Sequence, residues 1–318
     1  MEMVRLLVLS AGLMAAVLMA QVPAVSAESA AVTALQSRGA LDKFVNSFAA
    51  PTRQTGKLPR WENGICPLTV GQGPDIARYV TQHVKDVATT VDAPVSADPS
   101  CTPNIEIIFT ATPQDLLDNV RAHDADYLGY SESSAERERL ARVTRPIQAW
   151  YMTQTRDLRG MSRIDSGRSR GAGASMANFT DLPCIGCRGR NDAPIDLPNA
   201  GFASVSGNRI SNGMHSVLHH ILIVIDPAKV TDRGIGALAD YIAMLALTQI
   251  NSLDTCQQLP SIVNSLAPSC EQKADRITEN DLAYLNGLYS MKAEKNLAGQ
   301  QRQIADTMKD TLGRSGNR

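Results

Sequence analysis

The feature that most constrains the fold is an almost unbroken apolar run at residues 219–225, followed after a short turn by a second apolar run at residues 235–250. The first run is short and rich in β-branched side chains, which predicts a strand covered on both faces. The second has apolar residues on nearly every side, which indicates a helix that is buried all round. Together the two runs predict that the core of the fold is a β-sheet packed against helices.

Hydrophobic periodicity and turn residues predict the other elements. Expected strands lie at residues 66–71, 104–109 and 147–152. Expected helices lie at residues 29–50, 74–91, 113–120, 131–142, 256–267 and 278–289. Thr278 can cap the last of these by accepting hydrogen bonds from its exposed amides. The predicted fold class is therefore α+β, a mixed sheet packed with helices and followed by a helical C-terminal part.

Residues 1–27 have the form of an export signal, with Arg5 before an apolar run and a small-residue cleavage site that ends at Ala27. The apolar run is shorter than the ~20 residues that span a bilayer. We therefore expect a periplasmic or secreted protein with no membrane span after cleavage.

The rest of the chain divides by composition. Residues 28–57 are predicted to form an N-terminal helix and a polar linker. Residues 58–291 are predicted to form the main domain. Within it, residues 160–200 begin with a Gly/Ser/Arg-rich stretch, which predicts a flexible insertion. Residues 292–318 are polar and charged, which predicts a tail that is either a frayed helix or disordered.

The cysteine count is even, which in an exported chain favours disulfides that stabilise the fold. The six are Cys66, Cys101, Cys184, Cys187, Cys256 and Cys270. Their order favours bonds between consecutive members, one of fifteen possible pairings. The pair at 184 and 187 could instead be half of a zinc site, which needs four ligands, or a redox pair.

Composition argues against nucleic acid as a partner. The formal net charge is -1 and aromatic residues make up 4% of the chain. A near-neutral protein does not attract a polyanion over long distances, and few aromatic rings are present for bases to stack on.

Three of the five histidines, His215, His219 and His220, lie at the start of the apolar strand. Neutral imidazole is a good zinc ligand, so this group is a candidate metal or polar site. Regular strand geometry, however, points adjacent residues to opposite faces, which predicts that His219 and His220 cannot bind one ion. The alternative is that all three are partly buried histidines with hydrogen bonds to the backbone.

Four segments together resemble the secreted proteobacterial proteins that share a domain of unknown function, DUF2927. They are Leu-Pro-Arg-Trp at 58–61, Pro-Asn-Ile-Glu-Ile at 103–107, Ala-Asp-Tyr-Ile-Ala-Met-Leu-Ala-Leu at 239–247 and Leu-Ala-Tyr-Leu-Asn-Gly-Leu-Tyr at 282–289. The resemblance covers residues 58–291. The group has no settled activity, so it implies a location more than a reaction.

The order of strand and helix also resembles the zincin fold of metallopeptidases, in which a His-Glu-x-x-His helix follows a strand. Placing that motif on residues 239–243 puts its histidines at Ala239 and Ala243 and its glutamate at Asp240. Alanine cannot bind zinc, and aspartate is one methylene shorter than the usual general base. The resemblance therefore implies a zincin-like fold with no metal or other cofactor at the usual place.

Three functions follow as hypotheses. The first is a non-catalytic, zincin-like domain that binds a partner protein or an envelope component. The second is a metal-dependent hydrolase whose site has moved to His215, His219 and His220, with zinc as cofactor and Asp240 as a nearby acid. The third is a structural or adaptor protein that uses the Arg/Gly-rich insertion and the polar tail as contact segments. We favour the first, so the protein is not expected to be an enzyme.

Overall fold

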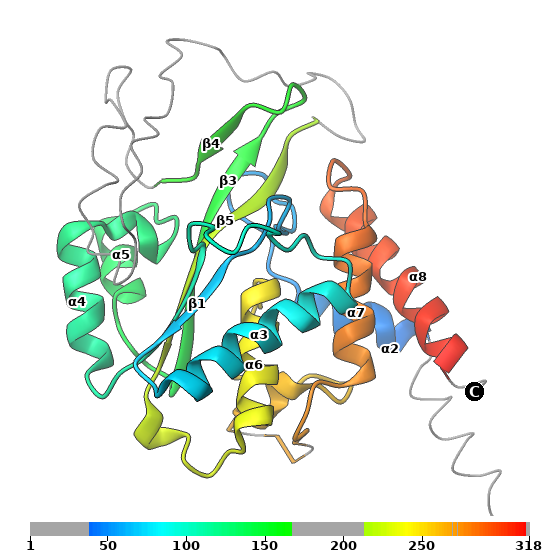
Figure 1. The fold of residues 1–318 in the computed structure, drawn as a ribbon. Coiled ribbons are helices and arrows are strands. Elements are labelled where there is room, and N and C mark those ends of the chain that lie inside the picture. Colours follow the sequence, from blue (N-terminus) through cyan, green and yellow to red (C-terminus); the bar gives the residue numbers. More distant parts are fainter. Residues whose placement is uncertain (1–37, 167–212, 269, 272, 316–318) are drawn as a thin grey trace, which may run out of the picture. The chain divides into compact units, whose positions relative to one another are not determined.

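The computed structural model describes residues 38–166, 213–268, 270–271 and 273–315. In this part of the chain the strands form one mixed sheet in the order β1-β2-β5-β3-β4, flanked by helices (Figure 1). The strands are β1 (Pro67–Val70), β2 (Ile105–Phe109), β3 (Ile147–Arg156), β4 (Ser162–Ile164) and β5 (His215–Ile225). The α-helices are α2 (Arg38–Phe48), α3 (Pro74–Thr90), α4 (Pro113–His123), α5 (Ser134–Leu140), α6 (Ile235–Leu247), α7 (Glu279–Ser290) and α8 (Leu297–Ser315). Short 3-10 helices are η1 (Ala125–Leu128), η2 (Pro227–Lys229) and η3 (Ile262–Ser265).

The sheet is mixed, with parallel and antiparallel neighbours. β1, β2 and β5 run parallel, and α3 is the crossover that a parallel pair such as β1 and β2 requires. β3 runs antiparallel to β5, and β4 to β3. This confirms the predicted fold class, a mixed sheet packed with helices.

β5 lies at the centre of the sheet and is covered on both faces, as its apolar sequence predicts. Ile221, Ile223 and Ile225 belong to a large core that also contains α3 and α6. Leu222 and Val224 belong to a smaller core on the other face, with residues of α4, η1 and β3.

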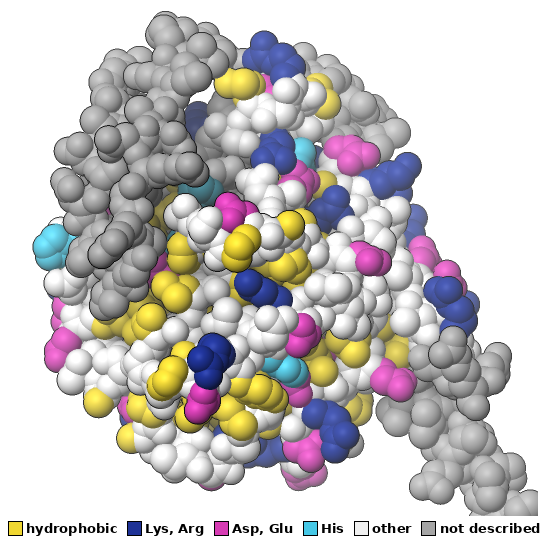
Figure 2. Space-filling model, viewed as in Figure 1, with side chains coloured by type: hydrophobic (Ala, Val, Ile, Leu, Met, Phe, Trp, Pro, Cys, Tyr) yellow, Lys and Arg dark blue, Asp and Glu magenta, His cyan; other side chains and the backbone are white. Residues whose placement is uncertain are grey.

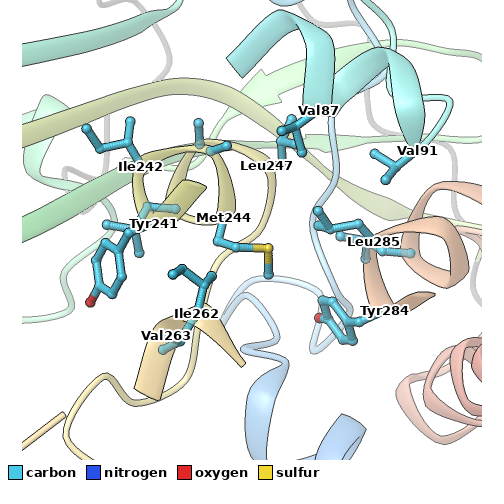
Figure 3. Packing of buried hydrophobic residues seen from close by; sticks show 14 of the residues in the cluster. Val87, Val91, Tyr241, Ile242, Met244, Leu247, Ile262, Val263, Tyr284 and Leu285 are labelled. Atoms are coloured by element: carbon cyan, nitrogen blue, oxygen red, sulfur yellow. The ribbon is translucent and has the colours of Figure 1, made fainter. Parts of the chain in front are cut away.

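α6 is the most buried helix, and its apolar surface explains why. Met244 lies between α3, η3 and α7 (Figure 3), and residues 239–247 are at most 6% exposed. The last carbonyls of a helix have no partner within it, and here aromatic side chains supply the donors. Trp61 Nε1 donates to Ala246 O (2.8 Å) and Tyr289 Oη to Leu247 O (2.8 Å). The predicted buried helix is confirmed, although it ends at Leu247 rather than at residue 250.

The C-terminal segment is largely polar and helical, as one of the two predicted alternatives has it, but residues 297–315 are neither frayed nor disordered. Residues 297–315 form α8, which packs on α7 and α2. Ile304, Ala305, Met308 and Leu312 form a narrow buried stripe on an otherwise polar helix. A stripe this narrow is hard to distinguish from a solvated helix by composition.

Two other segments differ from their predictions. Residues 51–59 do not form a free linker, because Thr52 and Lys57 are buried and Thr52 Oγ1 contacts Ser216 Oγ at 2.5 Å. Residues 256–267 contain only the short η3 instead of a longer helix.

Two of the predicted disulfides are present, Cys66–Cys101 and Cys256–Cys270. They are compatible with an oxidising, extracytoplasmic compartment. The pair Cys184 and Cys187, residues 1–27 and most of the predicted insertion lie outside the described residues. Within the described ranges, every helix is too short or too polar to cross a bilayer.

Candidate functional site

The two adjacent histidines of β5 lie on one face of the sheet, contrary to the prediction from strand alternation. Leu218 and Ile221 both belong to the large core, so the two residues between them face the other side. The pairing explains this, because Met152 is opposite His220 while Thr153 is opposite Leu218. His219 is therefore the extra residue of a β-bulge, which interrupts the alternation of side chains.

The pair makes polar contacts with neighbouring strands and with η1. Gln154 Nε2 and His219 Nδ1 are 2.7 Å apart. Burial, together with the nearby His220, lowers the pKa of His219 to about 4, so its imidazole is neutral at pH 7. The His220 ring lies edge-on to Tyr127 at 4.6 Å, and its Nε2 is 3.7 Å from Glu106 Oε1. The buried Nδ1 of His220 has no hydrogen-bond partner among the described residues.

His215 belongs to a different group. Its Nε2 is 3.1 Å from Glu62 Oε1, and Arg156 Nη1 is 2.6 Å from Glu62 Oε2. Burial opposes the ionisation of Glu62, but His215 and Arg156 outweigh it and hold the pKa of this carboxyl below its usual value. The three histidines thus do not converge. Within the described ranges, no three His, Cys, Asp or Glu side chains are close enough together to hold a metal ion.

Asp240 does not join the strand histidines either. Its Oδ1 is 2.6 Å from His83 Nε2 on α3, and its Oδ2 accepts from Ile277 N at 2.9 Å. The hydrogen bond to Asp240 raises the pKa of His83, against the effect of burial. Tyr79 stacks on the same imidazole at 5.7 Å. This pair could not be recognised from the sequence, because its members are 157 residues apart.

Tyr79 also belongs to a small exposed apolar area. Ile76 and Tyr79 on α3 and Ile235 at the start of α6 are each at least 40% exposed. Figure 2 shows hydrophobic side chains among interspersed acidic and basic ones on the face that carries α3. None of these three residues lines the cavity beside β3 or the one beside Tyr241.

A cavity of about 440 Å³ lies beside the edge of β3. We call it the β3-edge groove. Its lining residues are Ala50–Gln54, Leu128–Tyr130, Glu136, Arg139, Leu140, Ala149–Tyr151, Thr153 and Gln249–Asn251. The volume lies within the range of small-ligand sites, roughly 300–1,000 Å³. None of the residues that sequence reasoning selected lines it.

The groove has a strand edge along one wall. β4 pairs only with Gln154–Arg156, so residues 147–153 of β3 have no strand beside them on that side in the described part of the chain. Such an edge presents backbone donors and acceptors to any molecule that lies along it.

Comparison with known proteins adds no relative. No protein-family model matches this chain, and neither a curated protein nor a solved structure gives a match.

Proposed function

We propose that the chain is an exported, non-catalytic binding protein, periplasmic or secreted, whose zincin-like domain holds a partner or envelope component in the β3-edge groove. The observation that carries this proposal is the groove itself. It combines an open cavity of about 440 Å³ with a polar lining and with a stretch of β3 that, among the described residues, pairs with no further strand on that side. Such a site offers binding contacts, and its acidic lining residue, Glu136, is ion-paired with Arg53 and Arg139.

The positions that zincin chemistry would use support the non-catalytic part of the proposal. Ala239 and Ala243 have no donor atom and are completely buried. Asp240, at the position of the general base, is hydrogen-bonded to His83 and to the backbone amide of Ile277. A zincin zinc ion therefore does not fit these residues.

The test is to fill the groove. Gln54 and Asn251 are exposed lining residues, so Gln54→Trp and Asn251→Trp should occlude it with little effect on folding. Lys309→Trp, on the exposed side of α8, is the matched control. Partners that co-purify with the exported full chain, after crosslinking in the producing cell, should be lost with the two groove variants only. Undiminished capture by both, or stoichiometric zinc in the purified protein, would refute the proposal.

One observation favours a second candidate, a metal-dependent hydrolase with a relocated site. The bulge brings His219 and His220 to one face, and Glu106 lies beside His220. His215 is excluded from this set because it pairs with Glu62. Calorimetric titration of the full chain with zinc would distinguish the candidates, with His219→Ala as the control. Zinc uptake that disappears in the variant favours the hydrolase, whereas no uptake rejects it.

A further inference from the structure

We propose that a second, smaller cavity beside Tyr241 binds a short-chain organic acid, whose carboxylate accepts hydrogen bonds from the Tyr241 hydroxyl and from Arg145. We call it the Tyr241 cavity, and its volume is about 140 Å³. It shares no lining residue with the β3-edge groove, so the proposal is independent of the function proposed above. Three properties of the cavity support it: a buried hydroxyl without a partner, an arginine with unused donors, and apolar walls.

The cavity lies where the start of β3 meets α6 and the segments that follow α6 and η3. Its walls are residues 144–147, Tyr241 of α6, Leu253 and Asp254 after α6, and Leu266 and Pro268 after η3. Ile147 and Tyr241 belong to the large core, and Leu253 and Leu266 pack against it. The cavity is therefore built on the core of the fold.

The Tyr241 hydroxyl is a polar group that the fold leaves unused. The residue is 2% exposed, and its ring points away from Met244 (Figure 3). The hydroxyl is close enough to Arg145 and Asp254 to feel their charges, so it faces the cavity that both residues line. None of the described residues forms a hydrogen bond with it. By contrast, the buried hydroxyl of Tyr151 donates to Leu245 O at 3.0 Å.

A molecule in the cavity can reach this hydroxyl. The fully sealed, unpaired side-chain atoms of the described residues belong to His220, Arg233 and Gln249, and Tyr241 Oη is not one of them. Burial raises the pKa of Tyr241 far above its ordinary value, so the hydroxyl keeps its proton and can donate it in a hydrogen bond.

Arg145 supplies further donors beside the same cavity. Its Nε donates to Asp254 Oδ1 at 3.0 Å, and its Nη2 donates to Asp254 Oδ2. A guanidinium has five N–H groups, and Arg145 Nη1 has no acceptor among the described residues. The unpaired groups at this cavity are thus donors, one of them cationic, and the complementary ligand group is a carboxylate.

The position of Asp254 does not close the site. The Asp254 side chain is 61% exposed whereas that of Arg145 is 31% exposed, so the carboxylate lies nearer to solvent than its partner. A bound carboxylate would compete with Asp254 for the guanidinium. Removal of the Asp254 charge should therefore strengthen the binding of an anion and weaken the binding of a cation, which gives the proposal a test of sign.

The other walls and the volume set the size of the ligand. The remaining lining side chains, apart from Thr144, are apolar: Pro146, Ile147, Leu253, Leu266 and Pro268. A cavity of about 150 Å³ accepts a benzene-sized ligand, which has about six non-hydrogen atoms. Butanoate has the same number of such atoms, with a carboxylate at one end and a short alkyl chain for the apolar walls.

The experiment is a titration of the full exported chain with butanoate, followed by nuclear magnetic resonance of the ligand, with butanamide and butylammonium as matched neutral and cationic probes. Butanoate should bind most tightly. Tyr241→Phe should weaken its binding by about 10-fold, because one donor to a charged group is lost. The free energy of unfolding should not change, since no internal hydrogen bond is removed. Tyr79→Phe, which removes an exposed hydroxyl outside the cavity, should have no effect on binding.

The charge variants complete the test. Asp254→Asn should strengthen butanoate binding several-fold, whereas Asp232→Asn, at an exposed aspartate beside Arg233, should leave it unchanged. Gln54→Trp in the β3-edge groove should also leave it unchanged, so that the two sites succeed or fail separately. The inference is overturned if butanoate shows no saturable binding, if butylammonium binds equally well, if Tyr241→Phe has no effect, or if Asp254→Asn weakens binding.

Discussion

At the scale of single residues, Asp240 shows how this fold accommodates a buried carboxylate. The side chain bridges α3 and the segment before α7 through His83 and Ile277 N. We predict that Asp240→Ala lowers the free energy of unfolding by about 2 kcal/mol, because both partners lose their acceptor. Urea denaturation measures this change, with Asp310→Ala on the exposed side of α8 as the control. Equal losses in the two variants would show that the contacts of Asp240 contribute nothing specific.

The same pair makes stability depend on pH. The pKa of His83 is raised above its ordinary value of 6.5, chiefly by the hydrogen bond to Asp240. A raised histidine pKa means that the folded state binds the proton more tightly, so the added stability is complete below pH 6.5 and is lost as pH rises through the folded pKa. The advantage of wild type over His83→Gln should therefore be larger at pH 5.5 than at pH 9. An advantage that is constant or that grows with pH would contradict this assignment.

Sequence reasoning failed at the histidines for a reason that belongs to tertiary structure. The alternation rule separates His219 from His220, but the bulge depends on the register between β3 and β5. Register is set by which faces the two strands bury against their neighbours, and the sequence of one strand does not contain it. His83 and Asp240 were unpredictable for a similar reason, since only the packing of α3 on α6 brings them together.

At the scale of elements, the contact between α7 and α8 depends on a glycine. A side chain on Gly287 would meet Ile304 Cα at 2.9 Å. We predict that Gly287→Ala lowers the free energy of unfolding by about 1–3 kcal/mol through overpacking, despite the higher helix propensity of alanine. Gly313→Ala is the control, because nothing lies within 4 Å of the added atom, and it should be neutral or slightly stabilising. Thermal unfolding would check both, and a stabilised Gly287→Ala would mean that α8 packs less closely.

The segments that suggested a family resemblance act here as packing and capping elements. Arg60 Nη1 donates to Tyr289 O (2.8 Å) and Met291 O (2.7 Å), so it caps the end of α7, while Trp61 caps α6. Thr278 and Asp281 form the capping box that starts α7, as the cap prediction for Thr278 required. These residues therefore have structural roles that need no catalytic explanation.

Elements with a long apolar run could be predicted from sequence more reliably than the others. β5 and α6 bury most of their surface, so their apolar residues mark them clearly. The segment at 256–267 contains little regular secondary structure and is held by the disulfide between Cys256 and Cys270. A disulfide does not require a hydrophobic period in the sequence, so periodicity could not predict this conformation. The groove could not be predicted because its lining comes from loops, from β3 and from α5, which are far apart in sequence.

At the scale of the whole molecule, the two described disulfides tie different regions. Cys66–Cys101 joins the segments just before the parallel strands β1 and β2, across a sequence separation of 35. Cys256–Cys270 closes a separation of 14 in the segment between α6 and α7. The first therefore restrains a much larger loop of the unfolded chain than the second.

Loop length predicts how much each bond stabilises the protein. In the chain-entropy model the longer loop corresponds to about 4 kcal/mol and the shorter one to about 3 kcal/mol. Replacing Cys66 and Cys101 together by serine should therefore lower the free energy of unfolding more than replacing Cys256 and Cys270. Guanidinium denaturation of the oxidised proteins measures both losses, and the wild type after reduction and alkylation provides the common reference. A larger loss from the shorter loop would show that contacts in the folded state around residues 256–270, rather than the entropy of the unfolded chain, determine the contribution of that bond.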